Sequence, residues 1–212
     1  NRRHKYVEIR KIVRCNIDLQ IRICYNKSVK MRKYAKLFDE VCTMIERKKY
    51  LEKLISKKGN GLVKVITGIR RCGKSYLLFN IYKDYLKSIG VAEECIICLA
   101  LDDDENIKYR NPLELGKHIR NLTSDKSKTY YVFLDEIQKV VTIQNPYIEG
   151  VEDKISFVDV VLGLMKHDNI DVYVTGSNSK MLSSDILTEF RGRGDEIRVS
   201  PLSFSEFYNA FQ

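Results

Sequence analysis

The sequence predicts an α/β fold, in which a parallel β-sheet is covered by helices on both faces. Short and nearly continuous apolar segments recur along the chain, and such segments are typical of strands that are buried on both faces. Segments with helical periodicity separate them, and this alternation is typical of a parallel sheet. A glycine-containing segment, Gly68–Ser75, lies between the first apolar segment and the helical segment that follows it.

The composition indicates a soluble globular protein. The chain has 212 residues, of which 44% are hydrophobic and 31% are charged, and this length suits one ordinary domain with a sizeable core. No apolar run approaches the roughly 20 residues that a membrane span needs, so no membrane partner is expected. Six cysteines without regular spacing favour reduced thiols over a disulfide framework. We therefore expect a cytoplasmic protein.

The positive charge is concentrated in residues 1–43, which we expect to form a basic N-terminal extension. This segment carries a net charge of +8, out of +9 for the whole chain. Apolar and polar residues alternate over Val13–Ile23, which predicts a half-buried strand, and an apolar stripe over Lys30–Lys57 predicts a helix. A basic segment can bind nucleic acid through its phosphates, although a solvated charged face would give the same composition.

The second expected domain, residues 44–212, contains the alternating elements. Its expected strands are Leu62–Thr67, Glu94–Leu101, Tyr130–Leu134, Val172–Thr175 and Ile197–Val199. Its expected helices are Lys74–Lys87, Asn111–Thr123, Phe157–Lys166 and Leu182–Phe190. The spacing of Ser203 and Glu206 predicts a capping box that opens a last helix. Thr142–Ile155 is expected to be a surface insertion near the functional edge of the sheet, where it could form a partner loop or a lid.

Gly68–Ser75 matches the pattern G-x-x-x-x-G-K-[ST] of the P-loop, also called Walker A. Glycines allow the loop amides to point inward, where they form a nest for an anion. Lys74 would place its ammonium on the β- and γ-phosphates of ATP, and the Ser75 hydroxyl would bind Mg²⁺. The residues expected to bind the nucleotide are Gly68, Arg71, Cys72, Gly73, Lys74, Ser75 and Tyr76.

The apolar segment Tyr130–Leu134 is followed by two acidic residues, Asp135 and Glu136. A carboxylate at the end of a strand beside the P-loop can hold Mg²⁺, directly or through water. Glu136 could polarise a water molecule for in-line attack on the γ-phosphate. The sequence therefore predicts a Walker B arrangement, with Asp135 at the metal and Glu136 as the catalytic acid–base residue.

Two further positions are candidates for catalysis. The strand before Thr175 ends in small polar residues, so Asn178, or alternatively Ser177, could orient the attacking water. Arg193, or alternatively Arg191, precedes the last strand and could reach a γ-phosphate across a subunit boundary.

Four segments in order resemble one known family: VITGIRRCGKS, VFLDEIQKV, DVYVTGSNSKMLSSDI and EFRGRGDEIRVSPLSFSEF. They resemble the prokaryotic AAA-type P-loop ATPases that join an ATP-binding core to a C-terminal domain of unknown function. The resemblance runs from about Met44 to Gln212. It implies a five-stranded sheet in the order 5-1-4-3-2, ATP hydrolysis, and a chain that lacks the C-terminal domain of its relatives. It also implies a phosphate-binding role for Lys74, a metal site at Asp135 and Glu136, a sensor near Asn178 and an arginine finger at Arg193.

Three functions remain open at this point. The first is an ATPase that acts as a switch or motor, as a homo-oligomer or with the missing C-terminal domain as its partner. The second is a regulatory module whose nucleotide occupancy, rather than turnover, carries the signal. The third is an ATPase associated with nucleic acid through residues 1–43. Glu136 discriminates between the first two, because a module that only binds nucleotide has no need of a polarising acid.

Overall fold

The structure is a computed structural model that describes residues 47–176, 190 and 192–209. One compact unit comprises Glu46–Glu206 and carries the whole sheet. The predicted strand Val13–Ile23, most of the predicted helix Leu182–Phe190, and the candidates Ser177, Asn178 and Arg191 lie outside the described residues. Within the described ranges, no helix has the length and apolar character needed to cross a membrane.

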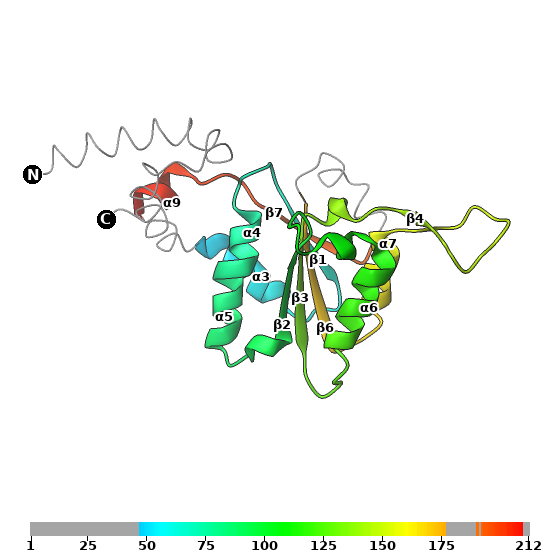
Figure 1. The fold of residues 1–212 in the computed structure, drawn as a ribbon. Coiled ribbons are helices and arrows are strands. Elements are labelled where there is room, and N and C mark those ends of the chain that lie inside the picture. The colour runs from blue at the N-terminus through cyan, green and yellow to red at the C-terminus, as the bar shows by residue number, and fades with distance from the viewer. Residues whose placement is uncertain (1–46, 177–189, 191, 210–212) are drawn as a thin grey trace, which may run out of the picture. The chain divides into compact units, whose positions relative to one another are not determined.

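Five parallel strands form the main sheet (Figure 1). They are β1 (Val63–Thr67), β2 (Ile96–Ala100), β3 (Tyr130–Asp135), β6 (Ile170–Thr175) and β7 (Gly194–Arg198). The strand order is β2-β3-β6-β1-β7, which confirms the expected order 5-1-4-3-2 when the five strands are counted along the chain. Because all neighbours are parallel, their carboxyl ends lie at one edge of the sheet.

Helices cover both faces of this sheet, as the sequence predicts (Figure 1). One face packs against α3 (Lys48–Lys57) and a helical segment made of α4 (Lys74–Tyr76), a π-helical stretch (Leu77–Tyr82) and α5 (Lys83–Ser88). The other face packs against α6 (Pro112–Leu122) and α7 (Phe157–Leu164). The three central strands, β1, β3 and β6, are buried at every residue, which explains their nearly continuous apolar sequences.

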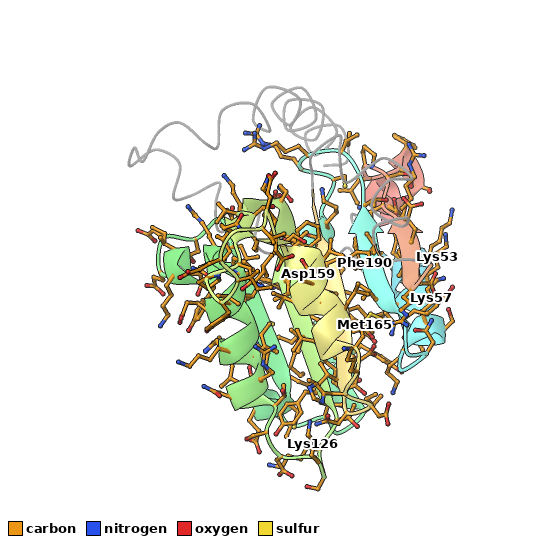
Figure 2. All side chains as sticks on the ribbon, turned by 90° about the vertical axis from the view of Figure 1, so that its right-hand side faces the viewer. Lys53, Lys57, Lys126, Asp159, Met165 and Phe190 are labelled. Atoms are coloured by element: carbon orange, nitrogen blue, oxygen red, sulfur yellow. The ribbon has the colours of Figure 1, made fainter. Side chains whose placement is uncertain are left out.

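Figure 2 shows α7 in front of the sheet, with Asp159 near its beginning and Met165 just beyond its end. Phe190 is buried and makes an edge contact with Phe157 of α7, with 6.3 Å between the ring centroids. This aromatic contact anchors the chain on the α7 face shortly before it enters β7.

Capping side chains define the helix starts. Asn111 accepts a 2.9 Å hydrogen bond from the amide of Leu113 at the start of α6, and Ser156 forms a capping box at the start of α7. The predicted capping box before the last helix, α9 (Phe204–Asn209), is confirmed. The amide of Ser203 donates to the Glu206 carboxylate at 2.8 Å, and the amide of Glu206 donates to the Ser203 hydroxyl at 3.2 Å.

Two predicted elements have different boundaries in the structure. Within the described residues, the helix predicted over Lys30–Lys57 is interrupted at Arg47, which adopts a left-handed conformation with φ of 46°, and α3 begins at Lys48; residues 30–46 lie outside the described residues. The strand predicted over Glu94–Leu101 begins at Ile96, because Glu93–Cys95 forms a turn of 3₁₀ helix. At the second of these breaks the apolar pattern continues through the turn, since Cys95 is buried although it precedes the strand.

The expected insertion Thr142–Ile155 is a short hairpin that projects from the sheet (Figure 1). Its antiparallel strands are β4 (Ile143–Gln144) and β5 (Lys154–Ile155). Between them, Tyr147 is 83% exposed. The hairpin begins shortly after Glu136, at the carboxyl edge of the sheet.

A buried ion pair joins β1 to β6. Lys64 is completely buried, and its ammonium donates to the carboxylate of Asp171. The same carboxylate accepts hydrogen bonds from the amide of Gly59 at 2.9 Å and from the hydroxyl of Tyr173 at 2.8 Å. Burial, reinforced by the charge of Asp171, raises the pKa of Tyr173, so this hydroxyl stays protonated and remains a donor.

We expect Asp171→Asn to lower the free energy of unfolding by about 3–5 kcal/mol, because it leaves the Lys64 ammonium buried without its counter-ion. Urea unfolding measures this change. The control is Glu94→Gln, which breaks the exposed pair between Glu94 and Lys128 and should cost less than about 1 kcal/mol. Equal losses in the two variants would contradict a stabilising role for the buried pair.

Candidate nucleotide-binding site

The glycine-containing loop Gly68–Ser75 connects the carboxyl end of β1 to α4. Gly68 has φ of 150°, and a Cβ at this position would lie 2.3 Å from the carbonyl oxygen of Val199. Gly73 also has a positive φ, 90°, which disfavours residues with a side chain. The two glycines of the pattern therefore allow the loop to pass close to the end of β7 and then to turn into the helix.

The Lys74 side chain is buried within this loop. Its ammonium donates to the carbonyl oxygens of Gly68 and Ile69, both at 3.1 Å, and lies 3.9 Å from the sulfur of Cys72. The loop carbonyls therefore surround the Lys74 ammonium. An ammonium in this position can exchange its carbonyl partners for the oxygens of a bound anion.

Asp135 is the last residue of β3 and is buried beside Ser75 and Thr175. The Thr175 hydroxyl donates to its carboxylate. Burial raises the pKa of Asp135, while the hydrogen bonds from Thr175 and Ser75 act in the opposite direction. The predicted metal ligands, Ser75 and Asp135, are thus in direct contact, although 60 residues separate them in the sequence.

Glu136 is held in place through both its backbone and its side chain. Its φ of 53° places it in the left-handed region, and its amide donates to the Thr175 hydroxyl oxygen at 3.2 Å. Its carboxylate accepts a hydrogen bond from the side-chain amide of Gln138, whose own carbonyl oxygen is buried without a hydrogen-bond partner. The left-handed backbone and these two contacts fix the direction of the Glu136 side chain at the edge of the sheet.

Thr175 is a site residue that the sequence analysis did not select. A single hydroxyl accepts from the amide of Glu136 and donates to Asp135, so it links the two acidic residues to the end of β6. The available signal was the small polar residue at the carboxyl end of a strand. Asn178 and Ser177, which were selected from that segment, lie outside the described residues.

The remaining residues of the predicted loop lie where the pattern places them. Within the loop, Cys72 is buried, whereas Arg71 is exposed and has φ of 65°. Tyr76 lies in the first helical turn after Ser75 and is half-buried.

The structure does not bring Arg193 to the loop of its own chain. Arg193 is exposed, and its carbonyl oxygen accepts a 2.9 Å hydrogen bond from the amide of Val63 at the beginning of β1. The loop follows Thr67 at the opposite end of that strand. At about 3.3 Å per residue, the length of β1 separates the two by about 13 Å. The backbone of Arg193 therefore lies at the opposite end of β1 from the loop.

Comparison with known proteins identifies one family. A family described as an AAA domain matches residues 60–208. An uncharacterized protein of Haemophilus influenzae is 35% identical over 167 residues, which cover 79% of this chain and 38% of that protein. An uncharacterized protein of Methanocaldococcus jannaschii is 33% identical over 159 residues, which cover 73% of this chain and 29% of that protein. The chain thus spans less than two-fifths of the length of these curated relatives.

Solved structures show a looser similarity. Drosophila ORC bound to DNA matches with a TM-score of 0.47 and 11% identity, over 77% of this chain and 95% of that chain. AMPPCP-bound DnaA from Aquifex aeolicus matches with a TM-score of 0.45 and 16% identity, over 75% and 46% respectively. The family match covers the loop, both acidic residues and every strand of the main sheet, and the chain belongs to the AAA domain family.

Proposed function

We propose that this domain binds ATP with Mg²⁺ and hydrolyses it to ADP and phosphate. The observation that carries the proposal is the convergence of three groups at one sheet edge. The Lys74 ammonium is enclosed by the loop, the Ser75 hydroxyl contacts the Asp135 carboxylate, and Glu136 follows directly. A phosphate-binding cation, a pair of oxygen ligands and an acid–base residue are the protein groups that phosphoryl transfer requires.

The loop suits the triphosphate because its backbone conformation requires glycine, which has no side chain. Any Cβ at Gly68 would collide with the Val199 carbonyl, so the backbone passes where no other residue fits. Lys74 would exchange its contacts with loop carbonyls for contacts with the β- and γ-phosphate oxygens. This exchange retains the charge in a buried place, where its interaction with an anion is strong.

Ser75 and Asp135 suit Mg²⁺ because both offer oxygen, which this hard cation prefers. When bound, the ion neutralises the charge that develops on the phosphate oxygens. The hydrogen bond from Thr175 holds the Asp135 carboxylate in position before any ion binds.

Glu136 is the residue proposed to activate water. It accepts a proton from the water as the water oxygen bonds to the γ-phosphorus, while the bond from that phosphorus to the bridging oxygen of ADP breaks. Its contacts with Gln138 and Thr175 support this role, because they keep the carboxylate at the edge that also carries Lys74. Asn178 is proposed as the residue that orients the water, and Arg193 as a contribution from a neighbouring copy.

A regulatory module with little turnover is the second candidate. Lys74, Ser75 and Asp135 would serve it equally well, because these residues bind nucleotide whether or not hydrolysis follows. The placement of Glu136 favours the ATPase, since its αL turn and its contact with Gln138 have no role in binding alone. The work that hydrolysis would drive, as a switch or motor and with or without nucleic acid, depends on partners beyond this domain.

We expect Lys74→Ala to lower the affinity for ATP by at least about 10²-fold while the domain stays folded. The loss corresponds to charged hydrogen bonds to two phosphates, each contributing about 1.5–3 kcal/mol. Isothermal titration calorimetry measures the affinity, and Lys53→Ala, on the surface of α3 (Figure 2), is the matched control. Equal affinities in Lys74→Ala and wild type would rule out the loop as the nucleotide site.

We expect Glu136→Gln to bind ATP with wild-type affinity and to hydrolyse it at least about 10²-fold more slowly, the usual scale of general-base assistance. Phosphate release measures turnover. Glu149→Gln, which removes an exposed carboxylate from the hairpin, should turn over at the wild-type rate. Wild-type turnover in Glu136→Gln would refute the assigned base, and no turnover in the wild type would favour the regulatory module.

We expect Asp135→Asn to stabilise the nucleotide-free protein and to abolish its response to Mg²⁺. Burial raises the pKa of Asp135 above its ordinary value, so the folded protein binds this proton more tightly than the unfolded chain does. The ionised carboxylate therefore costs stability as the pH rises through the shifted pKa, and it still does so at neutral pH. Thermal unfolding with and without ATP and Mg²⁺ measures both effects; a lowered melting temperature in the nucleotide-free variant would contradict this account.

A further inference from the structure

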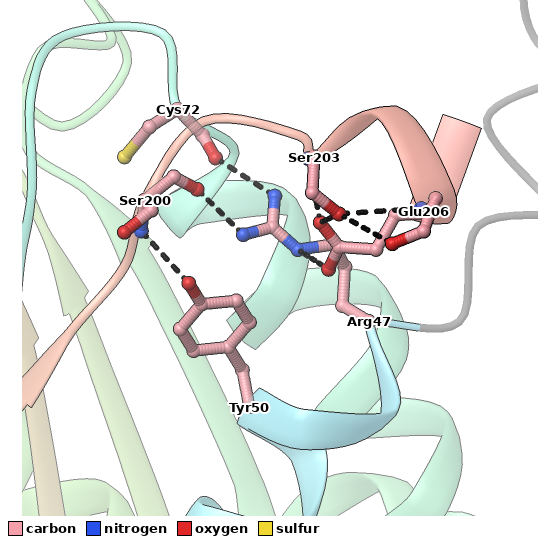
Figure 3. Close-up of polar contacts among 7 residues, drawn as sticks. Arg47, Tyr50, Cys72, Ser200, Ser203 and Glu206 are labelled. Atoms are coloured by element: carbon pink, nitrogen blue, oxygen red, sulfur yellow. Dashed lines mark hydrogen bonds and ion pairs between the residues drawn. The ribbon is translucent and has the colours of Figure 1, made fainter. Parts of the chain in front are cut away.

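Arg47, directly before α3, makes contacts with three separate segments of the domain (Figure 3). It is 6% exposed. One guanidinium nitrogen donates to the carbonyl oxygen of Cys72 at 3.2 Å, and the other donates to the carbonyl oxygen of Ser200 at 2.6 Å. Its Nε atom forms an ion pair with Glu206 at 3.2 Å. The fixed fork of a guanidinium allows these three contacts to form at once.

The first contact acts on the loop Gly68–Ser75, called the phosphate loop from here on after its proposed role. In a trans peptide the carbonyl and the following amide point in opposite directions, and the structure has no cis peptide bond within its described residues. Holding the Cys72 carbonyl toward Arg47 therefore turns the amide of Gly73 away from it. A Cβ at Gly73 would lie 3.7 Å from the same guanidinium, so Arg47 packs directly against the backbone that precedes Lys74.

The other two contacts act on the chain that leaves the sheet. Ser200 follows β7, and Glu206 lies in the first turn of α9. The Glu206 carboxylate also caps that helix through Ser203. Tyr50 strengthens the arrangement from α3: its ring lies 4.5 Å from the guanidinium carbon, and its hydroxyl accepts a 3.0 Å hydrogen bond from the amide of Ser200.

The left-handed conformation of Arg47 is consistent with this role. Its φ of 46° is uncommon for a residue with a side chain, and such conformations persist only where surrounding contacts impose them. A buried guanidinium that loses one partner is left with an uncompensated charge or donor. The loop and the segment 200–206 therefore cannot move independently without breaking a contact of Arg47.

We propose that Arg47 is a positioning residue that couples nucleotide occupancy of the phosphate loop to the segment 200–206. The coupling rests on the proposed ATP binding, and it is reciprocal: ATP stabilises the segment, and fixing the segment strengthens ATP binding. Arg47 does not contact the reacting atoms. It acts on them through the Cys72–Gly73 peptide.

The test compares Arg47→Met with Lys57→Met. Lys57 is the last residue of α3, the helix that follows Arg47 (Figure 2), and forms an ion pair with Asp195 of β7. Asp195 pairs with Lys64 near the beginning of β1, whereas the phosphate loop follows the end of that strand. Both variants thus remove an ion pair between the α3 region and the chain around β7. Calorimetry measures ATP affinity, and hydrogen–deuterium exchange of residues 200–206 is followed with and without saturating ATP.

In the wild type and in Lys57→Met, ATP should slow exchange in residues 200–206. In Arg47→Met, ATP affinity should fall about 10-fold, the scale of one lost charged hydrogen bond, and saturating ATP should leave exchange in this segment unchanged. A purely structural role would lower stability without removing the response to ATP. Wild-type affinity and a wild-type exchange response in Arg47→Met would overturn the proposal.

Glu206→Gln provides a second variant if Arg47→Met does not fold. It preserves the contact with Cys72 and removes the charge partner at α9, so affinity should stay within about twofold while the exchange response shrinks. An unchanged response in this variant would overturn the coupling. A wild type that fails to bind ATP would instead overturn the proposed function itself, so the two failures are distinguishable.

Discussion

The insertion of β6 between β1 and β3 is the constraint on which the rest of the structure depends. β6 pairs with both neighbours in parallel, and this arrangement brings the ends of three strands that are distant in sequence to one edge. The phosphate loop follows β1, Asp135 ends β3, and Thr175 ends β6. The buried contact of Lys64 with Asp171 lies within the β1–β6 pair, so an ionic interaction reinforces the pairing that assembles the site.

The site contains charged side chains that are buried, although burial is unfavourable for charged groups. Lys74 and Asp135 are both buried, and the protein meets their hydrogen-bonding needs with loop carbonyls and with hydroxyls of Ser75 and Thr175. Of these partners, the proposed nucleotide would replace only the loop carbonyls at Lys74, while the two hydroxyls would remain beside Asp135. The site is therefore organised before ligand binding, and little rearrangement would be needed at the moment of binding.

Arg47 lies outside the recognised motifs and nevertheless contacts one of them. It lies before the first helix of the described domain, yet it contacts the loop after β1 and the chain after β7. β7 is the neighbour of β1 in the sheet, and this adjacency brings the two segments within reach of one guanidinium. The exposed hairpin formed by β4 and β5 starts at the same edge of the sheet. The phosphate loop, the two acidic residues, the hairpin and the segment 200–206 therefore lie in one region.

The sequence by itself determined the fold class and the cap of the last helix, and it selected the glycine-containing loop and the two acidic residues as candidates, because these depend on local patterns. An apolar segment predicts a strand, and the spacing of glycines and lysine predicts an anion-binding turn wherever they occur. The sequence could not determine which strand ends would meet. Thr175 and Arg47 owe their roles to pairing between strands that are far apart in the chain, and Arg193 proved distant from Lys74 for the same reason. The apolar pattern also did not predict the break at Arg47. Contacts with Cys72, Ser200 and Glu206 impose its left-handed backbone, and only the tertiary structure supplies these contacts.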